Sequence, residues 1–233
     1  MRAVVIIPTY NERDNLELLV QQIQKHANDL HILIVDDNSP DGTGDVAEAL
    51  RSKDTSRVFV LHRKQKEGLG PAYVDGFRQA LSVGYEVILQ MDADLSHDPS
   101  YLPEFLDRIS SNDFVIGSRY LHGLSVVNWD FKRLMLSRLA TRYIQFVTRM
   151  PFSDCTGGFN CWRRETLEEI GFDDVFSNGY LFLAELKYKA YRKNFKVAEI
   201  QIVFTERNLG KSKLNWRIIW EAIWGVLKLR LKY

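Results

Sequence analysis

Acidic side chains follow an apolar run in EVILQMDADLSHDP, which spans residues 86–99. A carboxylate that is buried without a partner strongly destabilises a fold, so a positive group is expected beside these residues. Their oxygen ligands suit Mg²⁺ or Mn²⁺, and we predict that Asp92 and Asp94 bind such an ion together with a substrate diphosphate. A D-x-D pair is also common in turns after strands, so the pair alone leaves an ordinary turn open. The neighbouring His97 is expected in an exposed loop.

Three further polar clusters follow other apolar runs, and their sequences are PTYNE, DDNSPDGT and HRKQK. In the second cluster, Asp36, Asp37 and Asp41 offer hydrogen-bond acceptors for a base or a ribose. The stretch EGLGPA comes next, and its Gly68 and Gly70 allow a ligand to approach the backbone closely where a helix begins. Each cluster taken alone is also compatible with an ordinary turn or helix cap.

The elements that must position these residues alternate along the chain. Apolar, β-rich runs predict strands at residues 3–8, 31–37, 57–62, 86–92, 113–119 and 196–207. Three- and four-residue spacing of apolar side chains predicts helices at residues 15–27, 44–50, 72–84, 100–110, 131–150, 180–191 and in the C-terminal tail. A short strand is expected in TGGFNCWRR. This order predicts an α/β fold with a mainly parallel central sheet, helices on both faces and the polar clusters together at one sheet edge.

Composition limits the class of protein. The chain has 233 residues, of which 45% are hydrophobic and 26% charged, so it suits one substantial soluble domain and excludes a disordered or fibrous protein. The formal net charge is +1, so anion binding must come from local clusters of Lys and Arg, and no nucleic-acid partner is expected. Cys155 and Cys161 are the only cysteines and are predicted to be free thiols in a reducing compartment.

Seven motifs together resemble one family: PTYNE, DDNSPDGT, GLGPAY, MDADLSHDP, GSRY, DCTGGFNCWRR and FTERNLGKSKL. They are similar to those of the dolichyl- or polyprenyl-phosphate mannosyltransferases, which are inverting glycosyltransferases of family 2 with the GT-A fold. The resemblance runs from about Val4 to Leu214. It implies transfer of mannose from GDP-mannose to dolichyl or polyprenyl phosphate with inversion, giving a polyprenyl-phosphate β-mannose. It also implies a GT-A, Rossmann-like domain at residues 1–215, followed by a C-terminal amphipathic helix at residues 216–233.

The resemblance also implies roles for individual residues. Donor binding would involve Pro8, Tyr10, Glu12, Asp37, Arg63, Gly68, Asp92, Arg207 and Lys213. Catalysis would involve Asp94, Arg119, Arg133 and Ser137, with Arg119, Arg133, Ser137, Arg207 and Lys213 around the acceptor phosphate and the leaving diphosphate. Asp92 and Asp94 would hold Mg²⁺ or Mn²⁺. Some relatives carry Gln as a third ligand where Ser96 stands, so water is expected to take that contact here.

This inventory suits the implied reaction. A phosphate acceptor is already ionised at neutral pH, so it needs no general base, and arginines that pair with phosphate oxygens lower its repulsion from the diphosphate. The chain lacks the Q-x-x-R-W motif of processive synthases, which favours a single transfer. Two alternatives remain open: the same reaction with UDP-glucose, and a non-catalytic nucleotide-sugar-binding subunit. Arg138 and Arg142 are equally compatible with a solvated helix face.

The C-terminal segment 216–233 carries three tryptophans and several cations on a helix that is too charged to span a bilayer. It is predicted to lie in the membrane interface, and the alternative is an ordinary helix packed on the sheet. The expected location is therefore peripheral, on the cytosolic face of a membrane: the endoplasmic reticulum in a eukaryote, the plasma membrane in a prokaryote. Small membrane-anchoring subunits are candidate partners.

Overall fold

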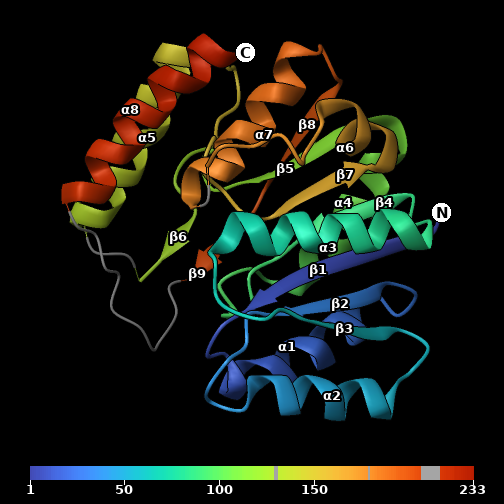
Figure 1. Ribbon diagram of the computed structural model, residues 1–233. Helices are drawn as coiled ribbons and strands as arrows, with labels where there is room; N and C mark the ends of the chain where they lie inside the picture. The colour runs from blue at the N-terminus through green and yellow to red at the C-terminus, as the bar shows by residue number, and fades with distance from the viewer. Residues whose placement is uncertain (129–130, 178, 206–215) are drawn as a thin grey trace.

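The computed structural model describes residues 1–128, 131–177, 179–205 and 216–233. Within these ranges, seven strands form one sheet in the order β3-β2-β1-β4-β7-β5-β8 (Figure 1). The strands are β1 (Ala3–Thr9), β2 (His31–Asp36), β3 (Val58–His62), β4 (Val87–Gln90), β5 (Phe114–Ser118), β7 (Asn160–Arg163) and β8 (Val197–Gln201). Only β7 runs antiparallel to its neighbours in this sheet, so the predicted mainly parallel sheet is confirmed.

Helices cover both faces of the sheet (Figure 1). They are α1 (Arg13–His26), α2 (Thr43–Lys53), α3 (Leu69–Val83), α4 (Leu102–Arg108), α5 (Phe131–Thr148), α6 (Arg164–Ile170), α7 (Tyr180–Arg192) and α8 (Trp216–Lys232), with 3₁₀ turns η1 (Pro99–Tyr101) and η2 (Ile109–Ser111) at the ends of α4. Alternate residues of β1 point to opposite faces, which makes two cores. Val4 and Ile6 belong to the core with α3 and α7, whereas Val5 and Ile7 belong to the core with α1 and α2.

Two segments differ from the sequence prediction. The strand expected at residues 196–207 is interrupted after Gln201, and Phe204–Thr205 forms a separate strand, β9. β9 pairs with β6 (Val126–Val127) in a second, two-stranded sheet. The interruption follows from the length of β5, which ends at Ser118 and offers β8 no partner beyond Gln201. The short helix α6 was not predicted, because its apolar positions are too few to make a helical period.

The predicted convergence of the strand ends is confirmed. In the parallel register Thr9 lies opposite Asp36, and Asp36 lies opposite His62. Gln90 at the end of β4 pairs with Ile6 of β1, so the chain leaves β4 at the same edge. The polar residues that follow these strands are therefore neighbours in space, although they lie far apart in the sequence.

Helix α8 packs beside α5 at one end of the molecule (Figure 1). Val226 and Leu229 are buried in the same core as α3 and α7, and the Tyr233 hydroxyl donates a hydrogen bond of 2.7 Å to the carbonyl of Asp174. The C-terminal half of α8 therefore contributes to the main core. The domain boundary after residue 215 stays a prediction. Among the helices that the structure describes, none combines the length and apolar character needed to cross a bilayer.

Gly76 tests the packing of α3 on the sheet. A Cβ atom at this position would lie 2.7 Å from Cγ2 of Ile6, which is itself fully buried on β1. We expect Gly76→Ala to lower the free energy of unfolding by about 1–3 kcal/mol through overpacking, measured by urea denaturation. Ser82→Ala on the exposed side of the same helix is the control and should change it by less than about 0.5 kcal/mol. Equal effects of the two substitutions would contradict this packing.

Candidate active site

The turn after β4 carries the D-x-D pair, and its own hydrogen bonds shape it. The Asp94 carboxylate is largely buried and accepts a hydrogen bond of 3.1 Å from the backbone N–H of Ser96 as well as one from the Ser96 hydroxyl. Leu95 between them has φ of 62°, a left-handed conformation that is unfavourable for a branched side chain. Ser96 therefore holds Asp94 in place within the turn. The Asp92 side chain is 33% exposed, so it is accessible to solvent.

His97 is buried, so the expectation of an exposed loop histidine is wrong. Its ring stacks on Phe159 with ring centroids 5.0 Å apart, and Nδ1 accepts a hydrogen bond of 3.1 Å from the backbone N–H of Asp92. Burial lowers the pKa of His97, so the imidazole is neutral and its proton lies on Nε2. Nε2 is 3.9 Å from Asp92 Oδ2. His97 thus supports the D-x-D turn from the buried side of the turn. Sequence reasoning missed this because Phe159, which directly precedes β7, lies far from His97 in the sequence.

Residues from the end of β1 lie beside the end of β2. Tyr10 has the ammonium of Lys66 above its ring, 3.6 Å from the centroid. The backbone N–H of Glu12 donates a hydrogen bond of 3.0 Å to the Thr43 hydroxyl, and its carboxylate accepts one of 2.8 Å from Asn15. Pro8 is the residue of β1 that pairs with Val35. The sheet therefore brings the residues of PTYNE that are predicted to bind the donor substrate to its carboxyl edge. Their roles in binding stay predictions.

Arg63 lies among three carboxylates and joins the end of β2 to α3. Its guanidinium contacts Asp37, Glu67 at 2.6 Å and Asp75 at 2.7 Å, and its side chain is only 6% exposed. Burial raises the pKa of the Asp37 carboxyl, although the hydrogen bond from Arg63 opposes the shift. Gly68, with φ of 112°, makes the turn into α3 that needs a glycine. Asp37, Arg63 and Gly68 are thus brought together as the sequence predicted.

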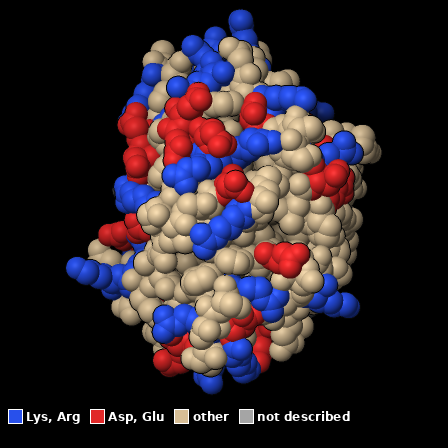
Figure 2. All heavy atoms as spheres, turned by 90° about the vertical axis from the view of Figure 1, so that its right-hand side faces the viewer, with Lys and Arg blue, Asp and Glu red and all other residues tan. Residues whose placement is uncertain are grey.

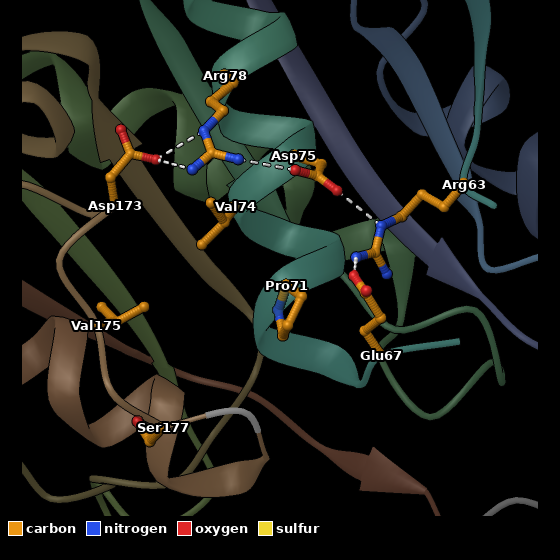
Figure 3. Close-up of a pocket in the computed structure, with 9 residues that line it drawn as sticks. All are labelled: Arg63, Glu67, Pro71, Val74, Asp75, Arg78, Asp173, Val175 and Ser177. Atoms are coloured by element: carbon orange, nitrogen blue, oxygen red, sulfur yellow. Dashed lines mark hydrogen bonds and ion pairs between the residues drawn. The ribbon is translucent and has the colours of Figure 1, made fainter. Parts of the chain in front are cut away.

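A surface cavity of about 230 Å³ borders this cluster (Figure 3). Arg63, Glu67 and Asp75 line one end of it, and Arg78 with Asp173 line the other. Both arginines are already engaged by carboxylates, because Arg78 binds Asp75 at 3.0 Å and Asp173 at 2.7 Å. Neither arginine is therefore left without a carboxylate partner to bind an anionic ligand in this cavity.

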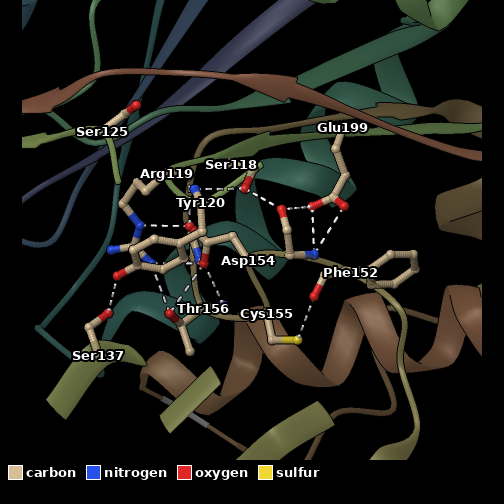
Figure 4. A network of polar contacts seen from close by, with 12 residues as sticks. Ser118, Arg119, Tyr120, Ser125, Ser137, Phe152, Asp154, Cys155, Thr156 and Glu199 are labelled. Atoms are coloured by element: carbon tan, nitrogen blue, oxygen red, sulfur yellow. Dashed lines mark hydrogen bonds and ion pairs between the residues drawn. The ribbon is translucent and has the colours of Figure 1, made fainter. Parts of the chain in front are cut away.

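Arg119 follows β5 and forms a buried ion pair with Asp154 (Figure 4). Arg119 Nε lies 2.6 Å from Asp154 Oδ2, and one terminal nitrogen lies 2.8 Å from Oδ1, so the contact is bidentate. The same nitrogen donates to the Thr156 hydroxyl at 2.8 Å. Burial alone would raise the pKa of the Asp154 carboxyl, but the Arg119 guanidinium outweighs it and the pKa lies well below the ordinary range. Asp154 therefore stays ionised and fixes the orientation of Arg119.

Ser137 connects α5 to the end of β5. Its hydroxyl is 2.8 Å from the hydroxyl of Tyr120, the residue after Arg119 (Figure 4). The Arg138 guanidinium lies above the Tyr120 ring, 5.1 Å from its centroid, so it is not a purely solvated side chain, whereas Arg142 is exposed. Arg133 lies one helical turn before Ser137 on α5. Arg207 and Lys213 lie outside the described residues, and their roles stay predictions.

The sequence prediction missed Asp154 as a member of the site. The motif DCTGGF marked the segment but gave no partner for its aspartate. β7 pairs antiparallel with both β4 and β5, so the turn before it approaches both Asp92 and Arg119. A Cβ atom on Gly158 would lie 3.4 Å from Asp92 Oδ1. A second chain of contacts, from Ser118 through Ser153 to Glu199, supports the same region.

The mainly parallel sheet with its acidic carboxyl edge is that of a glycosyltransferase of the GT-A fold, as the family match and the structural neighbours below show. The family model described as glycosyl transferase family 2 matches residues 4–171, and the chain belongs to this family. It is 46% identical over 231 residues to the polyprenol monophosphomannose synthase of Mycolicibacterium smegmatis, covering 97% of this chain and 87% of that one. It is 41% identical over 228 residues to the undecaprenyl-phosphate mannosyltransferase of Micrococcus luteus, covering 98% and 93%. The predicted resemblance to polyprenyl-phosphate mannosyltransferases is confirmed.

Solved structures agree with the fold. Glucosyl-3-phosphoglycerate synthase from Mycobacterium tuberculosis, in complex with Mn²⁺, uridine-diphosphate and phosphoglyceric acid, has a TM-score of 0.71 at 16% identity, covering 99% of this chain and 78% of that one. A mannosyltransferase from Pyrobaculum calidifontis, in complex with GDP-Man and Mn²⁺, has a TM-score of 0.64 at 19% identity, covering 93% and 60%. At these identities the likeness establishes the GT-A fold alone, which confirms the predicted fold class.

The Arg119–Asp154 pair makes a stability prediction. Asp154→Asn leaves a buried guanidinium without its counter-charge, so we expect the free energy of unfolding to fall by about 3–5 kcal/mol at pH 7, measured by urea denaturation. Because the folded-state pKa of Asp154 is lowered, its contribution is complete above the unfolded pKa, about 4, and is lost as the pH falls further. The difference between the two proteins should therefore shrink below about pH 4.

Asp173→Asn is the control for this prediction. It removes an exposed ion pair with Arg78, in which both side chains are more than half exposed, so its effect should stay below about 1 kcal/mol. A loss of similar size in both variants would mean that the Arg119–Asp154 pair is solvated.

Proposed function

We propose that the protein transfers mannose from GDP-mannose to a polyprenyl or dolichyl phosphate, with inversion at the anomeric carbon and with a divalent metal ion. The observation that carries this proposal is that the D-x-D carboxylates and the paired Arg119 meet at one sheet edge, through the turn that packs against both. The names of the two relatives above support the mannosyl group and the polyprenyl phosphate. The GDP-mannose bound to the structure from Pyrobaculum calidifontis supports the donor.

The residues present fit a divalent metal ion. Asp92 and Asp94 offer hard oxygen ligands at the strand end, and Ser96 fixes Asp94 in a single orientation. In the described ranges no group of three His, Cys, Asp or Glu side chains is arranged to hold a metal. His97 uses Nδ1 to accept from Asp92, so it is not a ligand. Two protein carboxylates suit Mg²⁺ or Mn²⁺, since such ions keep several waters and bind substrate phosphates. When bound, the ion would stabilise the charge of the leaving diphosphate.

The chain's own residues would then bring two anions together. The acceptor phosphate needs no base, so the task of the protein is orientation and charge compensation. We assign these roles to Arg119, Arg133 and Ser137, with Arg207 and Lys213 from the segment after β9. Arg119 is held by Asp154 and pre-oriented, so it loses little side-chain entropy when the acceptor phosphate binds. Pro8, Tyr10, Glu12, Asp37, Arg63 and Gly68 would hold the nucleotide.

We further propose that α5 and α8 contact the membrane that contains the lipid acceptor. Their large apolar side chains point to solvent: Phe146 is 85% exposed, Trp224 65% and Leu231 87%. α5 carries Lys and Arg but no Asp or Glu, whereas the face in Figure 2, away from these helices, mixes both charges. A basic and apolar surface suits anionic lipid head groups. This surface supports peripheral attachment to a membrane. We propose the cytosolic face as the location, with or without small anchoring subunits.

A donor panel tests the proposed function. The protein is incubated with a short polyprenyl phosphate, Mg²⁺ or Mn²⁺, and GDP-mannose or UDP-glucose, and the lipid-linked sugar is measured. We expect product with GDP-mannose and the β configuration at the anomeric carbon by NMR. Product with UDP-glucose alone would replace the donor assignment, and no product with either would favour a non-catalytic subunit.

Asp94→Asn tests the metal site. The amide keeps an acceptor for Ser96 but loses the charge, so we expect turnover to fall at least about 100-fold while the thermal unfolding midpoint changes little. Mn²⁺ affinity, measured by electron paramagnetic resonance with GDP present, should fall in parallel. Asp98→Asn is the matched control, because Asp98 is exposed and caps η1 through Ser100, and its activity should be retained. Wild-type turnover of Asp94→Asn at saturating metal would remove Asp94 from the site.

Substitutions on the outer surface of α5 and α8 test the membrane contact. We expect the double variant Phe146→Ser, Leu231→Ser to bind anionic vesicles at least about tenfold more weakly, because a buried apolar side chain of this size contributes about 1.5–3 kcal/mol. Both side chains are exposed, so stability should be unchanged. The control is Leu18→Ser on α1, an exposed apolar residue at another part of the surface. Co-sedimentation with vesicles measures the binding, and equal binding of all three proteins would place the contact elsewhere.

A further inference from the structure

Lys187 of α7 has its ammonium group in the protein interior. The residue has 0% relative exposure, and its Nζ donates hydrogen bonds to the backbone carbonyls of Asp154 at 3.0 Å and Gly157 at 2.9 Å. An apolar side chain at this position would avoid the cost of burying a charge. Burial lowers the pKa of Lys187 to about 8, and the Asp154 carboxylate opposes this shift. The two carbonyls that Lys187 holds belong to the turn that carries Asp154.

In the turn at residues 154–157, both backbone N–H groups and backbone carbonyls are engaged in hydrogen bonds. Asp154 Oδ1 accepts hydrogen bonds from the backbone N–H groups of Thr156 at 3.1 Å and Gly157 at 2.9 Å. Lys187 binds the carbonyls of the same turn, so donors and acceptors of its backbone are both used. The turn therefore has little freedom to rotate, and the Asp154 carboxylate is held in the bidentate contact with Arg119.

The same turn is packed too tightly to move without affecting its neighbours. A Cβ atom on Gly157 would lie 3.1 Å from both Asp154 Oδ2 and the carbonyl of Gly117, two residues before Arg119. The next residue, Gly158, approaches Asp92 as described above. A displacement of this turn would thus change the position of Arg119 and disturb the surroundings of Asp92.

We propose that Lys187 is a positioning residue for glycosyl transfer. It fixes the turn at residues 154–157, the turn fixes Asp154, and Asp154 orients Arg119 toward the acceptor phosphate. Lys187 itself touches neither substrate. This inference rests on the proposed function only for the identity of the group that Arg119 contacts, and the mechanical link from Lys187 to Arg119 is independent of it.

The central experiment compares two buried lysines of the same helix. Lys189 is also buried and donates to two backbone carbonyls, of Gly171 at 2.6 Å and Asp174 at 3.0 Å, but in a loop away from Arg119. We expect Lys187→Met to reduce kcat by about 10- to 100-fold with the KM for GDP-mannose unchanged. A small displacement of a group that must be aligned with the substrate, here Arg119, lowers the rate by a factor of this size. Lys189→Met should cost similar stability but leave kcat near the wild-type value. Equal losses of kcat in both variants would overturn the proposal.

A double-mutant cycle separates positioning from general destabilisation. If Lys187 acts through Arg119, Lys187→Met should cost no further activity in an Arg119→Ala background. Additive losses would overturn the proposal. Lys187→Arg, which keeps the charge and the donors, should recover part of the activity that Lys187→Met loses. Thr156→Val replaces Lys187→Met in this test if Lys187→Met fails to fold. It removes the hydrogen bond that Arg119 donates to the Thr156 hydroxyl of the same turn. The loss of activity that it causes should likewise vanish in the Arg119→Ala background.

Hydrogen exchange tests the link without an activity assay. The amide hydrogens of Arg119, Thr156 and Gly157 all donate to Asp154, and their exchange should accelerate in Lys187→Met but not in Lys189→Met. Unchanged exchange at these amides would overturn the proposal. If the wild-type protein makes no lipid-linked sugar, the proposed function fails, whereas the exchange result still decides whether Lys187 holds the turn.

Discussion

Two arginines at the carboxyl edge of the sheet, Arg63 and Arg119, are largely withdrawn from water, so each requires a counter-charge. Arg63 is surrounded by Asp37, Glu67 and Asp75, and Arg119 is bound by Asp154. This need for compensation organises the site. The partners come from different elements, so a charge on one strand fixes the turn or helix that supplies its counter-charge.

The antiparallel strand β7 makes the second of these pairs possible. It lies between β4 and β5, which run parallel to each other, and it brings the turn at residues 154–158 to the carboxyl edge from the opposite direction. The small residues Gly157 and Gly158 let the turn approach Gly117 and Asp92 closely. A parallel strand in this position would begin at the other edge of the sheet. The reversal of one strand therefore joins Asp92 to Arg119, which we propose to act on the donor and on the acceptor respectively.

Helix α5 links this site to the surface proposed to contact the membrane. Ser137 reaches Tyr120 beside Arg119, while Phe146 of the same helix is exposed. α8 lies against α5, with Val226 and Leu229 in the main core and Trp224 at the surface. The sequence offered two alternatives for the tail, a membrane-interface helix and a helix packed on the domain. The C-terminal half of α8 is packed on the domain, and its exposed side suits the interface as well, because an amphipathic helix has two sides.

The sequence by itself determined the parallel strands, the helices between them and the meeting of Asp36, Asp37 and Asp92 at one edge. Short-range periodicity encodes the elements, and the parallel order then fixes where the strands end. Only the tertiary structure decided that His97 is buried, that Arg119 pairs with Asp154 and that Lys187 holds the turn between them. Lys187 and Gly157 lie 30 positions apart in the sequence, and the residues of the other contacts lie farther apart still. No local pattern specifies such contacts. Their cause is the position of β7, which depends on pairing between strands that lie far apart in the sequence.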